Sequence, residues 1–321
     1  MTDFIAEFCQ NHNGDFETLK KMVFAAAEAG ATHGKIQSIT VDTLSFRPEF
    51  EEGLAIDGDV FAIKRPYESE YNRLKNLEVS EAETIKFIAL CKEVGIVPMT
   101  TCFARSQAEL LSDYGFEEIK VASYDCASYP LLRTLKSLFK KVVISTGATF
   151  DDEILYASQV MSGANFAFLH CVTMYPTPLE QLHLSRMNWL RDHSPVVGYS
   201  DHSHVKTTGL LASKAALFYG AEIVERHFTI LEESQTKDGP VSINPEQLQE
   251  LVRFDALSKQ EQENVLAAEM PNWQVMFGER LRELTDDELL NRAYYRGRFA
   301  SPRAETKGGR RMIFNWEETP T

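Results

Sequence analysis

VVGYSDHS, residues 196–203, is the stretch that decides the fold. Its β-branched and aromatic run predicts a strand ending near His202, and a helical pattern follows at residues 207–219. A second run, IVERHF at residues 223–228, predicts another strand that ends near His227. Strand, helix and strand in this order indicate a parallel βαβ unit, so both histidines are expected at the same end of a sheet.

The same alternation extends through the first 266 residues. Strands are predicted at residues 4–8, 34–39, 97–103, 118–123, 142–146, 166–172, 196–200 and 223–228. Helical patterns separate them, among others at residues 16–29, 82–94, 131–138, 151–161 and 207–219. Eight such units that close on themselves form a (β/α)8 barrel, the TIM-barrel architecture of the α/β class. A doubly wound open sheet is the competing architecture, and it is disfavoured because no G-x-G-x-x-G motif follows the first strand.

Two segments depart from this pattern. Residues 41–79 are too long for an ordinary βα loop, and they predict either an ordered excursion over the barrel mouth or a solvated insertion. Residues 267–321 predict a C-terminal extension, distinct from a catalytic barrel domain at residues 1–266. This extension is rich in cations, which makes it a candidate dimer arm. Those cations are Arg292, Arg296, Arg298, Arg303, Lys307, Arg310 and Arg311.

Composition and charge limit the classes of function. The chain of 321 residues has 44% apolar and 25% charged residues, as expected for a soluble globular protein. Its net charge of −14 argues against a nucleic-acid partner. No apolar stretch of about 18 residues and no signal-peptide pattern is present, so no membrane span is expected. The five cysteines show no C-x-x-C spacing, which is typical of free thiols in a reducing cytoplasm.

The two histidines suggest a metal site. His202 shares a strand phase with Ser200, and His227 shares one with Glu225. Two neutral imidazoles at neighbouring strand ends suit a divalent transition metal with open coordination positions. The alternative is a pair of hydrogen-bonded structural histidines.

Two lysines suggest an anion site. Lys35 and Lys120 lie within apolar strands, and lysine is rarely buried unless it is paired. If both project into one barrel mouth, a phosphate or a phosphoenol carboxylate between them removes their repulsion. The alternative is that each lysine pairs with a nearby carboxylate such as Glu7 or Asp125.

An anion site, a metal site and a spare carboxylate together suggest a condensation. The metal polarises an aldehyde as a Lewis acid, the lysines hold an anionic enol nucleophile, and a carboxylate positions or deprotonates a water. No nucleotide-binding loop and no G-x-S-x-G elbow is present in the sequence, which disfavours a kinase or a serine hydrolase.

Seven motifs, in order from about residue 4 to about residue 255, resemble those of the sialic acid synthases. They are IAE with NHNGD at residues 5–15, GKIQ at 34–37, KVAS at 120–123, ISTG at 144–147, LHC with YPTP at 169–178, GYSDH at 198–202 and ERHFT at 225–229. The resemblance implies a (β/α)8 barrel that condenses phosphoenolpyruvate with an N-acylated aldose, such as N-acetylmannosamine. The product would be a nonulosonic, sialic-type acid, with release of phosphate.

The resemblance also implies roles for individual residues and a homodimer. A divalent metal is expected on His202 and His227, most often Mn²⁺, with Mg²⁺ or Co²⁺ as alternatives. Carbon 3 of phosphoenolpyruvate attacks the aldehyde, and Glu7, or else Asp125, handles the water that adds at carbon 2. The residues expected to bind phosphoenolpyruvate are Lys35, Thr101, Lys120, Ser123, Ser145 and Ser200. The residues expected to face the sugar are Gln37, Asp125, Thr173 and Tyr175.

Three departures from the family pattern fall on the sugar side. Thr173 stands where the family usually has asparagine, and the sugar-binding aspartate after the eighth strand is absent or displaced, because Asp238-Gly239-Pro240 runs straight to Val241. The usual C-terminal antifreeze-like domain, which gives an arginine to the partner's site, is replaced by a short tail. That tail could supply an arginine in cis or across a dimer. A synthase for a different aldose and a catalytically degenerate sugar-binding homologue therefore stay open as alternatives.

Overall fold

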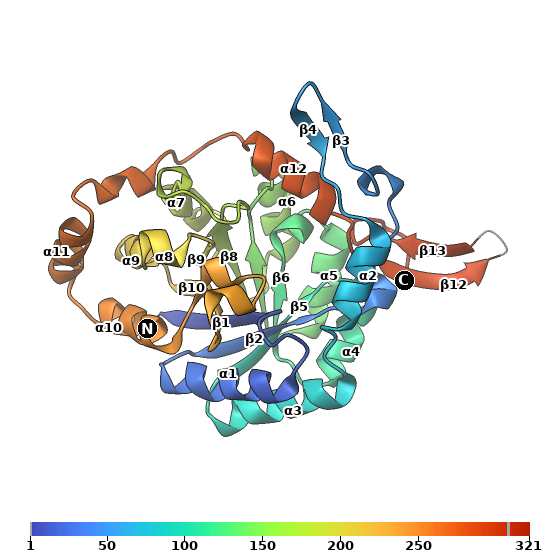
Figure 1. The fold of residues 1–321 in the computed structure, drawn as a ribbon, viewed down its shortest axis with the longest axis horizontal. Coiled ribbons are helices and arrows are strands. Elements are labelled where there is room, and N and C mark those ends of the chain that lie inside the picture. Colours follow the sequence, from blue (N-terminus) through green and yellow to red (C-terminus); the bar gives the residue numbers. More distant parts are fainter. Residues whose placement is uncertain (1, 307–308) are drawn as a thin grey trace.

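The computed structural model describes residues 2–306 and 309–321 and shows a closed parallel barrel (Figure 1). Each of the eight predicted strands is present, and β1 pairs with β10 to close the barrel. A short ninth strand, β11 (Ser242–Ile243), adds to the edge of β10. The barrel strands are β1 (Asp3–Cys9), β2 (His33–Ser38), β5 (Val97–Cys102), β6 (Glu118–Val121), β7 (Lys141–Ser145), β8 (Phe166–Cys171), β9 (Val196–Asp201) and β10 (Ile223–Phe228). The (β/α)8 prediction is confirmed.

Helices cover the outside of the barrel, where their apolar faces pack on the strands (Figure 1). Local signals fix their ends: Asp15 caps α1, and Ser80 with Glu83 forms a capping box at the start of α3. The predicted helix at residues 207–219 is divided in two at Gly209, whose φ of 58° does not continue a helix. The outer helices are α1 (Phe16–Glu28), α3 (Glu81–Glu93), α4 (Ala108–Asp113), α5 (Tyr129–Leu138), α6 (Asp151–Met161), α7 (Arg186–Arg191), α8 (Val205–Thr208), α9 (Leu211–Phe218), α10 (Pro245–Asp255) and α11 (Lys259–Glu269).

The barrel interior is apolar at one end and polar at the other. A small buried cluster fills the amino-terminal part of the barrel, formed by Ile5, Met99, Val143, Ala167, Leu169 and Ile223. Two positions further along the same strands, inward-facing residues are charged or hydroxylated, as with Glu7 on β1 and Ser145 on β7. The apolar floor therefore leaves the functional groups at the carboxyl ends of the strands.

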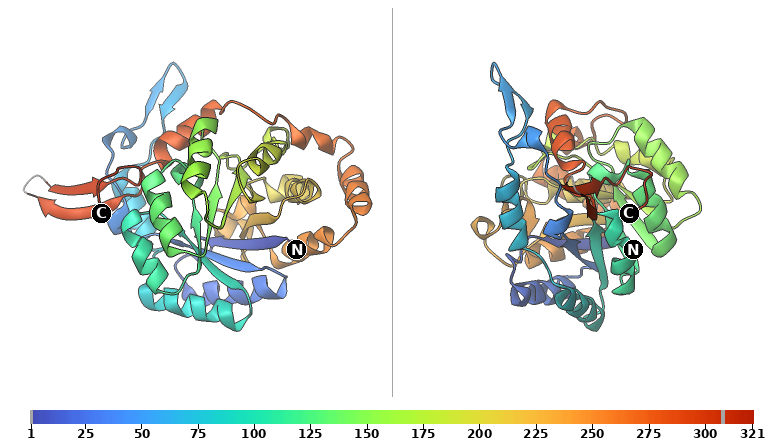
Figure 2. Two further views of the ribbon diagram at one scale, coloured as in Figure 1. Left: turned by 180° about the vertical axis from the view of Figure 1, so that it is seen from behind. Right: turned by 90° about the vertical axis from the view of Figure 1, so that its right-hand side faces the viewer.

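The insertion at residues 41–79 is ordered. It contains a hairpin of β3 (Leu54–Ile56) and β4 (Asp59–Ala62), followed by α2 (Tyr67–Lys75). Both views in Figure 2 show this hairpin projecting beyond the body of the barrel. The hairpin is solvated, whereas α2 and the residues just before it reach the barrel mouth, so both parts of the prediction hold for different stretches of the insertion.

The C-terminal extension returns to the barrel. It includes α12 (Asp286–Tyr295), β12 (Ser301–Thr306) and β13 (Gly309–Ile313). Arg292 anchors α12 by donating to the Ala148 carbonyl at 2.6 Å and to Glu153 at 2.5 Å. The predicted domain boundary at residue 266 falls within α11 and stays a prediction, and Lys307 lies outside the described residues. None of the helices in the described ranges is long and apolar enough to cross a membrane.

Candidate active site

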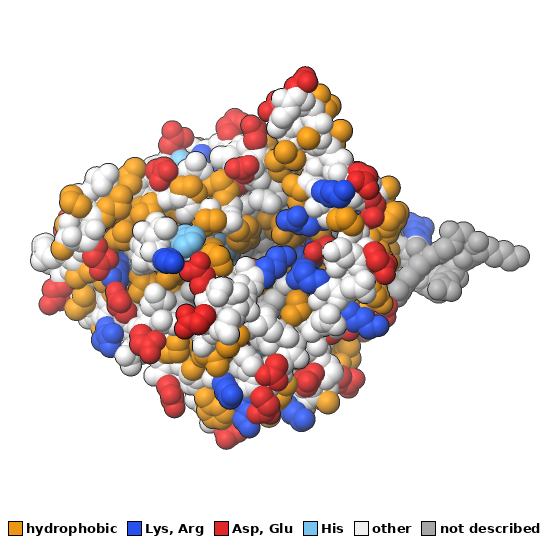
Figure 3. Space-filling view, in the orientation of Figure 1, with side chains coloured by type: hydrophobic (Ala, Val, Ile, Leu, Met, Phe, Trp, Pro, Cys, Tyr) orange, Lys and Arg blue, Asp and Glu red, His pale blue; other side chains and the backbone are white. Residues whose placement is uncertain are grey.

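A cavity of about 450 Å³ opens at the carboxyl ends of the barrel strands. Figure 3 shows Lys and Arg side chains beside the hollow on this face. Thr173 alone among the predicted site residues does not line it; it is fully buried, and its carbonyl accepts a hydrogen bond from Asn291 at 2.9 Å. The predicted residues that line the cavity are Glu7, Lys35, Gln37, Thr101, Lys120, Ser123, Asp125, Ser145, Tyr175, Ser200, His202 and His227.

Lys35 and Lys120 converge on one carboxylate, that of Glu225. The lysine nitrogens lie 3.6 Å and 3.8 Å from its two oxygens. Lys35 is also ion-paired with Glu7, whereas Asp125 pairs with neither lysine. Both lysines thus face one space, as predicted, and carboxylates balance their charge there. Glu225 had no predicted role, although the strand phase that it shares with His227 indicates that it points inward.

The pKa values of Lys35 and Glu225 reflect burial and the charges of neighbouring side chains. Burial lowers the pKa of Lys35 to about 8, the nearby Lys120 ammonium acts in the same direction, and Glu225 opposes them. Burial alone would raise the pKa of Glu225, but Lys120 and Lys35 hold it below its usual range. Glu225 is therefore ionised at neutral pH and keeps two cations close together.

Hydroxyl groups surround the lysines. Lys120 donates to Ser145 Oγ at 2.6 Å, Lys35 donates to Thr101 Oγ1 at 3.1 Å, and Ser200 donates to Glu225 at 2.9 Å. These groups can rotate to donate to an anionic ligand held by the lysines.

A glycine keeps the wall of the cavity close to this group. The Gly147 amide donates to Ser123 Oγ at 3.2 Å, and a Cβ on Gly147 would lie 2.5 Å from the Thr173 methyl group. A side chain at position 147 would therefore displace its neighbours on the cavity wall.

The two histidines lie together beside the lysine group, with His227 in register with Glu7 on the paired strand β1. Their ring centroids are 5.4 Å apart, and the ring of Tyr175 lies 4.4 Å from that of His202. Burial lowers the pKa of His202 to about 3 and lowers that of His227 as well. His227 Nδ1 is buried and has no hydrogen-bond partner among the described residues. Both imidazoles are thus neutral, and His227 Nδ1 could bind a metal. This arrangement differs from that of two structural histidines whose ring nitrogens are all hydrogen-bonded.

Two residues without a predicted role, Cys9 and Asp238, lie against His227. Donor atoms of Cys9, His227 and Asp238 all lie within 4.8 Å of one another, and Cys9 Sγ is 2.9 Å from Asp238 Oδ2. Asp238, which precedes Gly239-Pro240, also lines the cavity, and the family's aspartate after Gly-Pro is replaced by Val241. The group combines sulfur, nitrogen and oxygen donors that could hold a transition metal.

Asp125 is buried at the edge of the cavity. Burial raises its pKa from 3.8 to about 6, although hydrogen bonds from Asn315 at 3.0 Å and Ser128 at 2.8 Å lower it. Asn315 belongs to the C-terminal extension, so the extension contributes directly to the environment of a predicted catalytic residue.

Cations gather at the mouth of the cavity. Arg65, Arg73, Lys237 and Arg298 line it, and Glu70 pairs with both Arg73 and Arg298. These residues come from the insertion, from the loop after β10 and from the extension. Each of these segments departs from the expected pattern in the sequence, but the sequence does not show that their cations meet. The excess of positive charge favours anionic substrates in an otherwise acidic protein.

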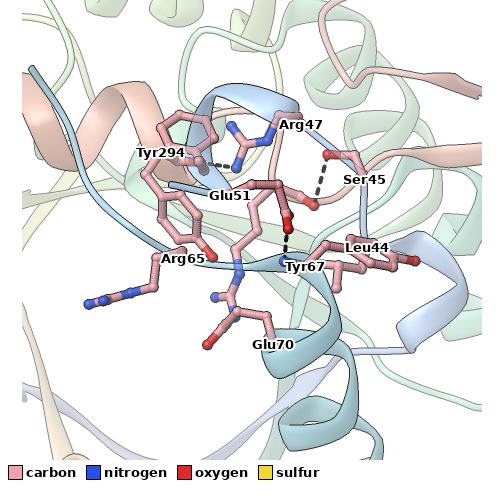
Figure 4. Close-up of a pocket in the computed structure, with 10 residues that line it drawn as sticks. Leu44, Ser45, Arg47, Glu51, Arg65, Tyr67, Glu70 and Tyr294 are labelled. Atoms are coloured by element: carbon pink, nitrogen blue, oxygen red, sulfur yellow. Dashed lines mark hydrogen bonds and ion pairs between the residues drawn. The ribbon is translucent and has the colours of Figure 1, made fainter. Parts of the chain in front are cut away.

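A second, much smaller pocket lies behind this mouth, between the insertion and α12 (Figure 4). There Arg47 donates to the Tyr294 carbonyl at 2.5 Å, as the dashed line in Figure 4 marks. Its guanidinium also lies 4.4 Å from the centroid of the Phe50 ring. These contacts hold the insertion and the extension together. They therefore help to fix the positions of the arginines that both segments contribute to the mouth.

With this geometry in view, comparisons with known proteins identify the family. Residues 22–263 match the model of the NeuB family. The chain belongs to the NeuB family. It is 32% identical over 265 residues to the N,N'-diacetyllegionaminic acid synthase of Campylobacter jejuni, covering 78% of this chain and 74% of that one. It is also 32% identical over 255 residues to the N-acetylneuraminate-9-phosphate synthase of Drosophila melanogaster, covering 77% and 65% of the two chains.

A solved structure supports the same assignment. The spore coat polysaccharide biosynthesis protein SpsE of Bacillus subtilis superposes with a TM-score of 0.71 at 25% identity. That match covers 98% of this chain and 84% of the other. The NeuB relatives named above are sugar-acid synthases, so a synthase activity is the coarse function that this family membership supports.

Proposed function

We propose that this NeuB protein condenses phosphoenolpyruvate with an N-acylated aldose to give a nonulosonic acid and inorganic phosphate. The observation that carries the proposal is the convergence of Lys35 and Lys120 on one point of the cavity, beside His202 and His227. A trianionic enol phosphate needs such paired ammonium groups, and an aldehyde acceptor needs an electrophilic partner next to them.

The lysine group would bind and orient phosphoenolpyruvate. Lys35 and Lys120 would hold its phosphate and carboxylate, with hydroxyls of Thr101, Ser145 and Ser200 and of Ser123 completing the contacts. Binding of these anions would compete with the ion pairs that Glu225 and Glu7 make with the lysines. The carboxylates would then be released from neutralising the lysines and become available to accept protons.

The residues present fit a divalent metal at the histidine wall. His202 and His227 are neutral, buried donors at neighbouring strand ends, and one nitrogen of His227 has no hydrogen-bond partner among the described residues. A bound metal there supplies Lewis-acid polarisation of the aldehyde oxygen of the acceptor. Manganese is the expected ion, with magnesium and cobalt as alternatives.

Carboxylates would manage the water that adds at carbon 2. Glu7 is the first candidate, because it is buried in the cavity and lies against the Lys35 ammonium. Glu7 would become a stronger base once Lys35 binds the substrate and no longer pairs with the Glu7 carboxylate. Asp125 is the second candidate, and with Gln37 and Tyr175 it would face the sugar. We expect a homodimer and a cytoplasmic location on the family pattern.

A different acceptor is the second candidate function, and Thr173 motivates it. Its side chain packs behind Gly147 and outside the cavity, so it offers no direct contact to a sugar. Asn291, from the extension, lines the cavity instead. An altered acceptor site beside an intact lysine and histidine group is what a synthase for another aldose would show.

Phosphate release tests both candidates. The purified chain with Mn²⁺ and phosphoenolpyruvate would be supplied with N-acetylmannosamine, 2,4-diacetamido sugars or simple aldoses. Release that depends on one acceptor and stops with a chelator supports the proposal and identifies the acceptor class. Binding of phosphoenolpyruvate without release from any acceptor would contradict the condensation and favour the degenerate sugar-binding homologue.

A further inference from the structure

We propose that Cys9 and Asp238 are metal ligands together with His227, so that this chain has a thiolate-containing metal site. The inference deepens the proposed function, because it assigns further ligands to the metal that the function needs. The histidine pair alone does not describe the cluster: the group whose donor atoms lie within 4.8 Å is Cys9, His227 and Asp238, with His202 beside it.

The three residues come from different parts of the chain and meet at one wall of the cavity. Cys9 is the last residue of β1, His227 is the penultimate residue of β10, and Asp238 follows in the loop after β10. β1 and β10 are paired in the closed barrel, with Glu7 opposite His227, so the position of Cys9 relative to His227 is set by the sheet. All three line the cavity, which gives an ion access to them.

The backbone at Cys9 is in an uncommon conformation for a residue other than glycine. Its φ is +46°, in the left-handed region that favours glycine, and the pairing of β1 with β2 shifts register between Glu7 and Cys9. Such conformations cost free energy and concentrate at functional sites. Here the shift points the sulfur at Asp238, 2.9 Å away, and the Cys9 amide donates to Glu7 at 2.7 Å.

The ligand types set the metal preference. Thiolate with imidazole and carboxylate suits Co²⁺, Zn²⁺ or Fe²⁺, whereas Mg²⁺ prefers oxygen ligands. A bound cation also converts the Cys9 thiol to the thiolate, releasing one proton to solvent for each metal bound. The site is thus expected to bind cobalt much more tightly than magnesium.

Cobalt absorption tests the inference without any need for turnover. The chain, freed of metal, would be titrated with Co²⁺, and a thiolate-to-cobalt charge-transfer band in the near ultraviolet is expected alongside the visible bands of the ion. Cys9→Ser and Cys9→Gly should both lose the charge-transfer band. Glycine accepts the positive φ, so Cys9→Gly keeps the experiment valid if the serine variant does not fold.

Cys171 provides the matched control. It is a buried free cysteine that lines the same cavity, with its sulfur 3.6 Å from His202 Nδ1. Cys171→Ser should keep the band. Asp238→Asn should keep the band as well but weaken cobalt affinity at least tenfold, since even outer contacts of metal ligands are worth about that much.

The outcomes separate this inference from the proposed function. Visible cobalt bands without a charge-transfer band, or a band that survives in both Cys9 variants, would overturn the thiolate ligand while leaving a metal on the histidines. Absence of any cobalt spectrum would overturn the metal site, and acceptor-dependent phosphate release in chelator would then leave the condensation standing without it.

Discussion

The buried carboxyl group of Asp125 gives a quantitative prediction about pH and stability. Its pKa is about 6 in the folded protein against an ordinary value of 3.8. The folded state therefore holds the proton more tightly than the unfolded chain, so the favourable contribution is complete below about pH 4 and is lost as the pH rises through about 6. A shift of about two pKa units corresponds to about 3 kcal/mol at neutral pH.

Replacing Asp125 with asparagine removes this dependence, because the amide does not ionise and can still bond to Asn315 and Ser128. We expect the free energy of unfolding of Asp125→Asn to rise relative to that of the unmodified chain by about 3 kcal/mol between about pH 4 and pH 7. Urea denaturation, followed by tryptophan fluorescence, measures the free energy of unfolding of each of the two chains. Taking the difference between the two chains cancels the titration of every other group that they share.

A second variant tests the cause of the shift. Asn315→Leu removes a donor that stabilises the carboxylate, so the pKa of Asp125 should rise further and the loss of stability should extend to higher pH. In the Asp125→Asn background the same leucine should leave the pH profile unchanged. A stability difference between Asp125→Asn and the unmodified chain that stays constant from about pH 4 to pH 7 would refute the assignment of a raised pKa to this group.

Three further predictions concern the active site. Lys35→Met should weaken phosphoenolpyruvate binding at least tenfold by calorimetry, as expected for a lost charge-assisted hydrogen bond, and an equal loss of acceptor affinity would contradict the anion site. His227→Ala should abolish chelator-sensitive phosphate release with an unchanged circular dichroism spectrum; retained activity would exclude it as a ligand. Gly147→Ala should lower the free energy of unfolding by about 1–3 kcal/mol through overpacking, and it should reduce kcat/KM by displacing Ser123. A fully active, equally stable variant would show that the neighbouring side chains can move to accept the methyl group.

The features that the sequence predicted are those encoded by short-range patterns. Each barrel strand carries its own apolar run. Lys35, Lys120 and His227 lie within such strands and His202 directly follows one, so the pattern places all four in the barrel mouth without any knowledge of distant contacts. The helix caps are likewise local. The break at Gly209 was missed because the apolar pattern continues through it.

Features that depend on the exact path of the backbone were not predictable. Strand phase suggests that Glu7 and residue 9 point the same way, but it does not show the register shift that aims Cys9 at Asp238. The pairing of both lysines with Glu225 depends on the relative heights of β2, β6 and β10, which closure of the barrel sets. The alternation of side chains along a strand predicts which face of the sheet a side chain occupies, but it does not predict which residue that side chain contacts.

The C-terminal extension places one of its arginines, Arg298, at the mouth of the cavity. Arg298 reaches the mouth from its own chain: the Ser45 amide donates to its carbonyl at 2.9 Å, and Glu70 pairs with its guanidinium, 228 residues away in sequence. The ring of Phe299, which follows it, contacts that of Phe103 from the loop after β5 at a tilt of 48°, with ring centroids 5.0 Å apart. Because backbone, ion pair and ring contact all fix this arginine in cis, its place at the cavity does not depend on a dimer. Truncation after Leu290 should therefore weaken acceptor binding even in a monomer, whereas unchanged acceptor affinity and unchanged oligomeric mass would show that the extension contributes to neither.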